Sequence, residues 1–323
     1  MDARLRKYQP ESDFMRVRNF LVDTFSLTEN PLNWKLERWN YAQYFITPML
    51  ATNGIGEPDV QAIKAARYLW NHSCALWENE IGEIVGVVNV EHADKNHSDW
   101  GEIFIQHHPD YNHLLSTMLA YAETNLFNLK DRRVFIPIYD YDDALIAAVQ
   151  ERGYHKNDRY TIWDSVYVIP DTISESPLPK GYSIYSMADV GSDIDKRRKA
   201  FGVGFNHPEP VDWPSRIAYQ GLQQAPDYQP VLDIYLVTPD GEYGSFCIAW
   251  WDEVNLIACL EPVGTVPSHR RKGLARAVVF EAIRRVADLG ARRVFVGSDQ
   301  LFYQSIGFEP SLPAHHWERK VGV

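Results

Sequence analysis

The sequence predicts an α/β protein made of two tandem domains, on three observations. Its 323 residues exceed one ordinary domain and suit two domains of about 150 residues each. Strand-like and helix-like patterns alternate along the chain. The order of these patterns in the first half returns in the second half, as expected for a duplicated unit.

Two short motifs mark the repeat. Residues 132–135 (RRVF) return at residues 292–295, and residues 150–154 (QERGY) are paralleled by residues 304–308 (QSIGF). A polar, proline-rich segment between the halves can bury little surface and suits a linker. We therefore expect a first domain over residues 1–170, a linker over 171–179 and a second domain over 180–323.

The first half begins with a strand at residues 4–9, and Pro10 then opens a helix whose apolar residues keep helical spacing as far as Phe25. The segment 31–68 is rich in aromatic residues, which more often form a core than a ligand site, and it leads into a helix that ends near Trp70. The remaining expected elements are strands at 74–77, 84–91 and 100–105, a helix at 111–127, a strand at 132–138, a helix at 142–152 and a strand at 161–169 that closes the half.

The second half repeats this order. Residues 182–185 predict a strand, and the helix that follows at 189–201 is expected to break at Gly202 and Gly204. After a variable stretch at 205–230 come strands at 233–237, 243–251 and 255–266. The next helix starts at Leu274, and its expected apolar face carries Leu274, Val278, Ile283, Val286 and Leu289. A strand at 293–296 and a short helix at 301–305 complete the pattern.

The junction between the strand at 255–266 and the helix at Leu274 predicts an anion site. A helix N-terminus presents unpaired backbone N–H groups and the positive end of the helix dipole. Gly273 lets a diphosphate approach the backbone without a Cβ in the way, Ala275 keeps the next turn small, and Arg270, Arg271 and Lys272 add positive charge. The alternative is a capped surface helix with a solvated basic edge.

Two motifs in this order resemble the GCN5-related N-acetyltransferases. Arg270-x-x-Gly273-x-Ala275 is similar to that family's diphosphate turn, and Tyr303-x-x-x-Gly307-Phe308 is similar to its later tyrosine segment. The close resemblance covers about residues 182–310, and a weaker form covers the first half. It implies two tandem acetyltransferase domains, each with a mixed, mainly antiparallel sheet flanked by helices, and acetyl-CoA as cosubstrate. The coenzyme-binding residues implied are Val263, Gly264, Thr265, Arg270, Arg271, Lys272, Gly273, Leu274, Ala275 and Arg276.

The resemblance also implies catalytic roles for two residues. Glu261, on an otherwise apolar strand, is expected to take the proton of the acceptor amine directly or through water, and Tyr303 is expected to protonate the thiolate of coenzyme A. The structural alternatives are a solvent-facing glutamate at a strand end and a core tyrosine. Backbone N–H groups near residues 263–265 are expected to hold the thioester oxygen, where Pro262 and Pro267 should interrupt regular strand pairing. The expected reaction is direct transfer of acetyl to a primary amine of a small molecule or peptide.

The chain departs from the family pattern in two places. Where many members carry an asparagine before the tyrosine, this chain has residues 297–300, so that Ser298 or Asp299 would have to replace it. In the first half, Asn112 and Leu115 stand where the second half has Arg270 and Gly273. We therefore expect a first domain that kept the fold, lost the diphosphate turn and serves packing, dimerisation or the acceptor pocket. The loop after the first helix of the second domain is expected to border the acceptor site.

Composition limits the remaining classes. A net charge of −11 argues against nucleic acid as a partner and is compatible with a cationic amine. No run of about 18 apolar residues predicts a membrane span, and no signal-peptide pattern opens the chain, so a cytoplasmic location is expected. The three cysteines and the histidines at 107, 108 and 113 lack metal-site spacing, so no metal is expected. A homodimer is compatible with the sequence, and the rival function is a non-catalytic acyl-CoA-binding or scaffold protein.

Overall fold

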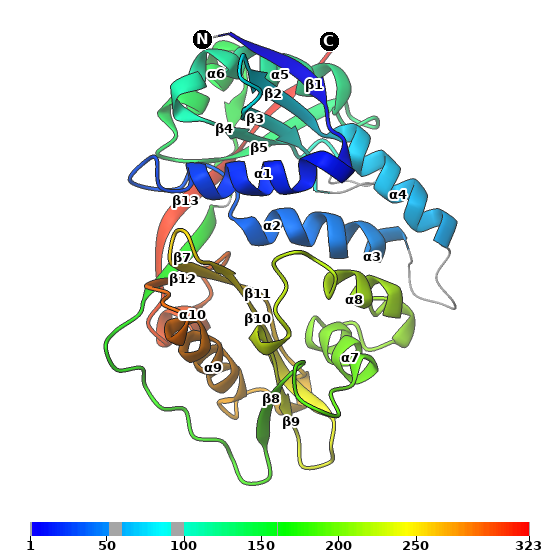
Figure 1. The fold of residues 1–323 in the computed structure, drawn as a ribbon, viewed down its shortest axis with the longest axis vertical. Coiled ribbons are helices and arrows are strands. Elements are labelled where there is room, and N and C mark those ends of the chain that lie inside the picture. The colour runs from blue at the N-terminus through cyan, green and yellow to red at the C-terminus, as the bar shows by residue number, and fades with distance from the viewer. Residues whose placement is uncertain (1, 52–59, 92–99, 160, 323) are drawn as a thin grey trace. The chain divides into compact units, whose positions relative to one another are not determined.

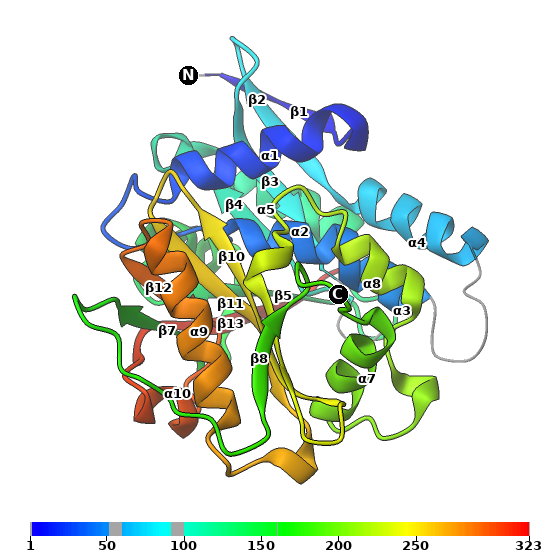
Figure 2. The ribbon, with the colours of Figure 1, turned by 60° about the horizontal axis from the view of Figure 1, so that its bottom comes forward.

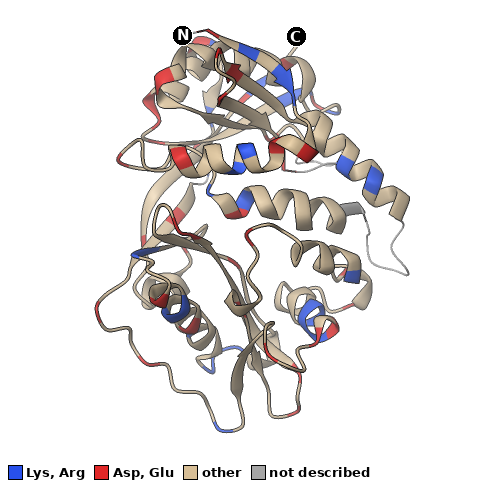
Figure 3. Ribbon diagram, in the orientation of Figure 1, with Lys and Arg blue, Asp and Glu red and all other residues tan. Residues whose placement is uncertain are grey.

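The computed structural model describes residues 2–51, 60–91, 100–159 and 161–322, so that residues 52–59 of the aromatic-rich segment lie outside it (Figure 1). Two compact units are present, and each is described by itself. Unit 1 comprises Met1–Leu50, Lys64–Asp164 and Pro310–Val323, and unit 2 comprises Ala51–Ile63 and Ser165–Glu309. No helix in the described part of the chain has both the length and the apolar composition that crossing a bilayer requires. Acidic and basic residues are interspersed on the helices and loops of both units (Figure 3).

The elements follow the predicted alternation. Residues up to 170 form β1 (Ala3–Lys7), α1 (Pro10–Thr24), α2 (Leu36–Tyr41), the π-helical turn η1 (Ala42–Ile46), α3 (Thr47–Ala51), α4 (Val60–Ser73), β2 (Ala75–Asn79), β3 (Ile84–Asn89), β4 (Phe104–His107), the 3-10 helix η2 (Pro109–Leu114), α5 (Leu115–Asn125), β5 (Arg133–Tyr139), α6 (Asp143–Glu151), β6 (His155–Lys156) and β7 (Ile162–Val168).

The later residues form β8 (Ser183–Ser186), α7 (Ile194–Gly204), η3 (Pro210–Asp212), α8 (Arg216–Leu222), η4 (Pro230–Leu232), β9 (Asp233–Val237), β10 (Tyr243–Asp252), β11 (Ile257–Thr265), η5 (Pro267–His269), α9 (Leu274–Asp288), β12 (Arg293–Val296), α10 (Leu301–Ser305) and β13 (Glu309–Lys320).

In unit 1, strands β1 to β4 form an antiparallel meander in chain order, and α1 and α5 both pack on β3. The chain before β4 then bridges to β5, since the Ile103 N–H donates to the Phe135 carbonyl at 2.9 Å. The aromatic residues expected to form a core do so: Trp39 and Trp70 are fully buried, and their indole N–H groups donate to the carbonyls of Phe14 and Val90. Burial of each indole with its polar group satisfied stabilises this unit.

In unit 2, the strand order is β7-β12-β11-β10-β9-β8, and all pairs are antiparallel except β11 with β12. Helix α9 covers one face of the sheet, and α7 covers the other (Figures 1 and 2). The expected apolar face of α9 is buried at Leu274, Val278, Ile283 and Val286, whereas Leu289, the C-cap residue of the helix, is 49% exposed. The predicted class, an α/β protein with mixed, mainly antiparallel sheets flanked by helices, is therefore confirmed.

Each unit contains a strand from the other half of the sequence. β13 pairs antiparallel with β5, and its Trp317 lies in the core of unit 1. β7 pairs antiparallel with β12, and its Tyr167 lies in the core of unit 2. The strand expected at 161–169 is present as β7, but it pairs with β12 of unit 2, and β13 was not predicted at all. The compact units do not coincide with the two halves of the repeat, because β7 and β13 each pack in the other unit. The linker at 171–179 therefore stays a prediction about where one repeat ends and the next begins.

Three other expectations need correction. Helix α7 does not break at the glycines but runs to Gly204, and the stretch 205–230 contains the helix α8. The ring of Trp213 lies where a Cβ on Gly202 would project, 2.2 Å from Cδ1, so this glycine allows close packing rather than ending the helix. The expected helix at 111–127 begins as the 3-10 helix η2, and the N–H of Leu115 donates to the Asn112 carbonyl within that turn.

Candidate active site

The site lies where two parallel strands of unit 2 separate. β11 and β12 pair only from Ile257↔Arg293 to Cys259↔Phe295, while β11 continues to Thr265 beside β10. The β10–β11 register shifts between Cys247 and Ala249, so that Glu261 and Pro262 together oppose Ile248. An extra residue of this kind bends a strand and re-aims its side chains. The interruption expected near the prolines is therefore confirmed on the Pro262 side.

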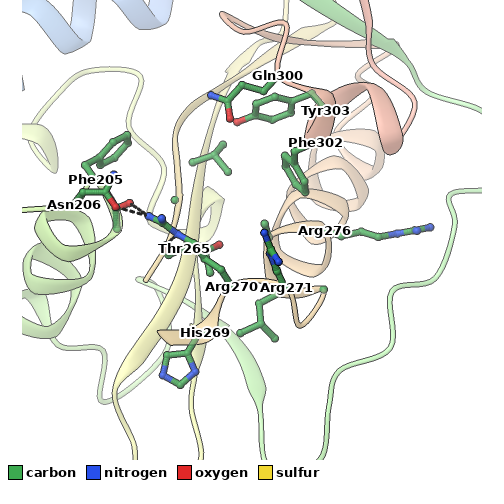
Figure 4. Close-up of a pocket in the computed structure, with 16 residues that line it drawn as sticks. Phe205, Asn206, Thr265, His269, Arg270, Arg271, Arg276, Gln300, Phe302 and Tyr303 are labelled. Atoms are coloured by element: carbon green, nitrogen blue, oxygen red, sulfur yellow. Dashed lines mark hydrogen bonds between the residues drawn. The ribbon is translucent and has the colours of Figure 1, made fainter. Parts of the chain in front are cut away.

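A cavity of about 580 Å³ opens beside this separation (Figure 4). Its walls come from the end of α7, the end of β11, the turn before α9 and the start of α10. The lining residues are Gly204, Phe205, Asn206, Val263, Gly264, Thr265, His269, Arg270, Arg271, Gly273, Leu274, Ala275, Arg276, Gln300, Phe302 and Tyr303. All the residues predicted for the site line it except Glu261 and Lys272.

The turn before α9 is shaped to receive an anion. Arg271 and Gly273 both have left-handed backbone angles, with φ of 59° and 78°, and Gly273 is the N-cap of α9 without a side-chain cap. The backbone N–H groups of the first helical turn have no acceptor within the helix, and they carry the positive end of its dipole. A Cβ on Gly273 would meet no protein atom within 4 Å, so the space in front of this glycine is open.

The basic side chains around the turn do different things. Arg270 donates to the carbonyls of Thr265 and Gly204 and to Oδ1 of Asn206, at 2.9 to 3.0 Å. The Arg276 guanidinium lies 5.2 Å from the centroid of the Phe280 ring on its own helix. Lys272, outside the cavity lining, donates to the Tyr182 hydroxyl at 3.3 Å. The Nε and Nη2 groups of Arg270 are thus bound by protein oxygens, and the backbone N–H groups of the turn are donors suited to a phosphate.

Tyr303 reaches the cavity from helix α10, whereas Glu261 lies on β11 just outside the cavity lining. Tyr303 is 7% exposed, and its ring packs edge-on against Phe302 and Phe308. Burial raises the pKa of Tyr303, and the neighbouring carboxylate of Glu261 raises it further, so the phenol stays protonated at neutral pH. Glu261 is partly buried next to the cavity, and its carbonyl accepts a hydrogen bond of 2.7 Å from Trp250 Nε1.

Several lining residues were not singled out from the sequence. Gly204, Phe205 and Asn206 form the wall opposite α10, and only the first two positions of the expected acceptor stretch 205–230 reach the cavity. Gln300 lines it, whereas Ser298 and Asp299 do not. The Ser298 carbonyl accepts a hydrogen bond from the Ser165 hydroxyl on β7 at 2.6 Å. The signal that could have found Asn206 is its own residue type, since asparagine tolerates its φ of 66° better than most residues.

Comparison with known proteins agrees with this geometry. Residues 205–308 match the model of the Acetyltransferase (GNAT) family. A solved tandem GNAT protein from the clavulanic acid biosynthesis pathway is 12% identical, with 100% of this chain and 99% of that chain covered and a TM-score of 0.57. A GCN5-related N-acetyltransferase from Sphaerobacter thermophilus is 17% identical, with coverages of 88% and 94% and a TM-score of 0.55.

The fold is also found in a further protein. The N-myristoyltransferase of Saccharomyces cerevisiae is 11% identical over 98% of this chain and 79% of that chain, with a TM-score of 0.52. No curated protein sequence matches the chain. The matched segment, residues 205–308, is a domain of the Acetyltransferase (GNAT) family. The chain as a whole shares the fold of the solved tandem GNAT protein.

Proposed function

We propose that the protein is an N-acetyltransferase that moves the acetyl group of acetyl-CoA to a primary amine of a small molecule or peptide. Transfer is direct, within a complex that holds both substrates. The proposal rests on one observation: the open turn at Gly273 and the buried phenol of Tyr303 line the same cavity. The first suits a diphosphate, and the second suits a leaving thiolate.

The residues divide the chemistry as follows. The amine nitrogen attacks the thioester carbonyl, a C–N bond forms and the C–S bond breaks. Glu261 accepts the proton that the amine loses, directly or through water, and Tyr303 donates a proton to the departing sulfur. Backbone N–H groups at residues 263–265 are proposed to stabilise the oxygen on which negative charge develops. One proton leaves the nitrogen and one reaches the sulfur, so the transfer consumes no net proton.

We further propose a single coenzyme site per chain, in unit 2. Leu115, which stands where the repeat has Gly273, is 1% exposed in the core of unit 1. Its N–H is already bound to the Asn112 carbonyl, so it is not available to a phosphate. Calorimetric titration of the full chain with acetyl-CoA is expected to give one site, and two sites of similar affinity would contradict this assignment.

The transferase reaction is tested by release of free thiol from acetyl-CoA in the presence of an amine panel. The panel contains tyramine, tryptamine, spermine, glucosamine and peptides with a free N-terminus. Tyr303→Phe is expected to keep the affinity for acetyl-CoA and to lower kcat by roughly 10²- to 10⁴-fold. Full activity in this variant would remove the tyrosine from the mechanism. Tight binding without thiol release for any amine would favour the non-catalytic acyl-CoA-binding function instead.

A further inference from the structure

Arg270 joins two parts of unit 2 that are distant in the sequence. Its Nε donates to the Thr265 carbonyl at the end of β11 at 3.0 Å. Its Nη2 donates to the Gly204 carbonyl, the last residue of α7, at 2.9 Å and to Asn206 Oδ1 at 3.0 Å. Figure 4 shows the Arg270 side chain reaching across to Asn206. A planar guanidinium fixes such a set of acceptors in a way that a single ammonium group does not.

The segment that Arg270 holds is a compact wall of the cavity, formed by Gly204, Phe205 and Asn206. The backbone N–H of Asn206 donates to the Val203 carbonyl at 3.0 Å, and the backbone N–H of His207 donates to the Gly202 carbonyl at 2.9 Å. Asn206 has a left-handed φ of 66°. Gly204 allows a close approach, because an added Cβ would lie 3.1 Å from Cε1 of Phe246. The wall therefore has one defined conformation with amides that report on it.

The backbone of Arg270 belongs to the turn before α9, where the diphosphate is proposed to bind. Its backbone directly precedes Arg271, the first of the two left-handed residues of this turn. The turn and the wall line the same cavity, and they are tied through one side chain. A ligand that fixes the backbone of the turn also fixes the point from which the Arg270 side chain reaches the wall. The turn and the wall are then coupled, so that binding at one changes the conformational stability of the other.

We propose that Arg270 is a positioning residue that transmits coenzyme binding to the acceptor wall at residues 204–206. The inference rests on the proposed function, because it assigns that wall to the acceptor side. The Nε and Nη2 groups of Arg270 are engaged by three protein oxygens, so these donors hold the wall rather than a phosphate. Coenzyme binding holds the turn, the turn holds Arg270, and Arg270 holds the wall in the conformation that accepts the amine.

Hydrogen exchange of the full chain, with and without acetyl-CoA, tests the coupling. In the parent protein, acetyl-CoA is expected to slow exchange at residues 205–207 at least about fivefold, the lower end of usual coupling. Arg270→Lys keeps the positive charge but loses the planar set of guanidinium N–H donors. In this variant acetyl-CoA should no longer slow exchange at residues 205–207 (a ratio of about 1), while protection at residues 271–276 remains. The Kd for acetyl-CoA should change by less than about threefold. Arg292→Lys, which alters an exposed arginine of unit 2 outside the cavity lining, is the matched control and should keep the response.

A pair of variants at Asn206 separates the hydrogen bond from backbone strain. Asn206→Gly removes the acceptor and tolerates the positive φ, whereas Asn206→Asp tolerates it and keeps an acceptor. The first should lose the wall response, and the second should retain it. For any amine turned over by the parent, Arg270→Lys and Asn206→Gly should raise the acceptor KM more than they lower kcat.

The outcomes separate the two proposals. Coenzyme binding that protects the turn but leaves residues 205–207 unaffected in the parent would overturn the role of Arg270 and leave the transferase proposal standing. An equal response in Arg270→Lys and in the parent would do the same. If the parent bound no acetyl-CoA, both proposals would fall.

Discussion

Replacing Gly273 by alanine places one methyl group at the point where the coenzyme diphosphate is proposed to bind. The glycine has φ of 78°, and an added Cβ would touch no protein atom within 4 Å. The cost to folding is therefore the left-handed conformation alone, roughly 1 to 2 kcal/mol. For a unit of this size, that corresponds to a fall in Tm of about 2 to 8 °C.

The effect on binding should be larger than the effect on folding. The new methyl keeps the phosphate from at least one backbone N–H, and a hydrogen bond to a charged group contributes roughly 1.5 to 3 kcal/mol. The Kd for acetyl-CoA, measured by calorimetry, should therefore rise about 10- to 150-fold. Gly153→Ala is the control, since Gly153 in unit 1 has the same φ of 78° and the same open surroundings. An unchanged Kd in Gly273→Ala, or an equal rise in Gly153→Ala, would refute the site assignment.

Three further predictions concern stability. Gly264→Ala should lower Tm by the equivalent of about 1 to 3 kcal/mol, because the new Cβ would lie 2.3 Å from Cζ of Phe246. The double variant with Phe246→Leu should recover part of this loss. An unchanged Tm in the single variant would show that the Phe246 ring moves freely. Hydrogen bonds from Arg6 hold the pKa of Glu78 below its usual range, so the stability it contributes is present above about pH 4.3, the unfolded value, and is lost as the pH falls through the lower folded pKa. Acid titration of Glu78→Gln should therefore show a shallower loss of stability below pH 4.3 than the parent, and parallel curves would contradict it. Removing residues 309–323 should accelerate hydrogen exchange throughout β5, whose antiparallel partner is β13, and unchanged protection there would disprove the strand assignment.

The local elements of unit 2 could be predicted because their signals are local. The apolar period of α9, the glycine at its N-terminus and the apolar run of β11 all lie within short windows of sequence. The strand exchange could not be predicted in this way. The β-branched and aromatic residues of 162–168 indicate that a strand forms, but they do not name the partner strand. β7 and β13 come from equivalent places in a repeat, so each suits either sheet.

The glycines of α7 and the arginine of the turn show a second limit. Gly202 and Gly204 suggested the end of a helix, yet Trp213 and Phe246 occupy the room that side chains would need, and the helix continues. The charge of Arg270 suggested a phosphate ligand, but its three acceptors include two backbone carbonyls, which no sequence pattern identifies. The prediction for the glycines failed because tertiary contacts decide what they do, and such contacts also give Arg270 partners that its residue type does not identify.

The exchanged strands also bear on how the chain is made. β5 leaves the ribosome about 170 residues before β13, which at 5 to 20 residues per second means a wait of roughly 10 to 35 s. During this time β5, with Phe135, Ile136 and Ile138, lacks the neighbour that covers one of its edges. An unpaired apolar edge can add a strand from another chain, although Pro137, which has no N–H, weakens such pairing. Slower initiation or lower temperature during expression should therefore raise the soluble yield, because nascent chains would meet less often before their last strand arrives.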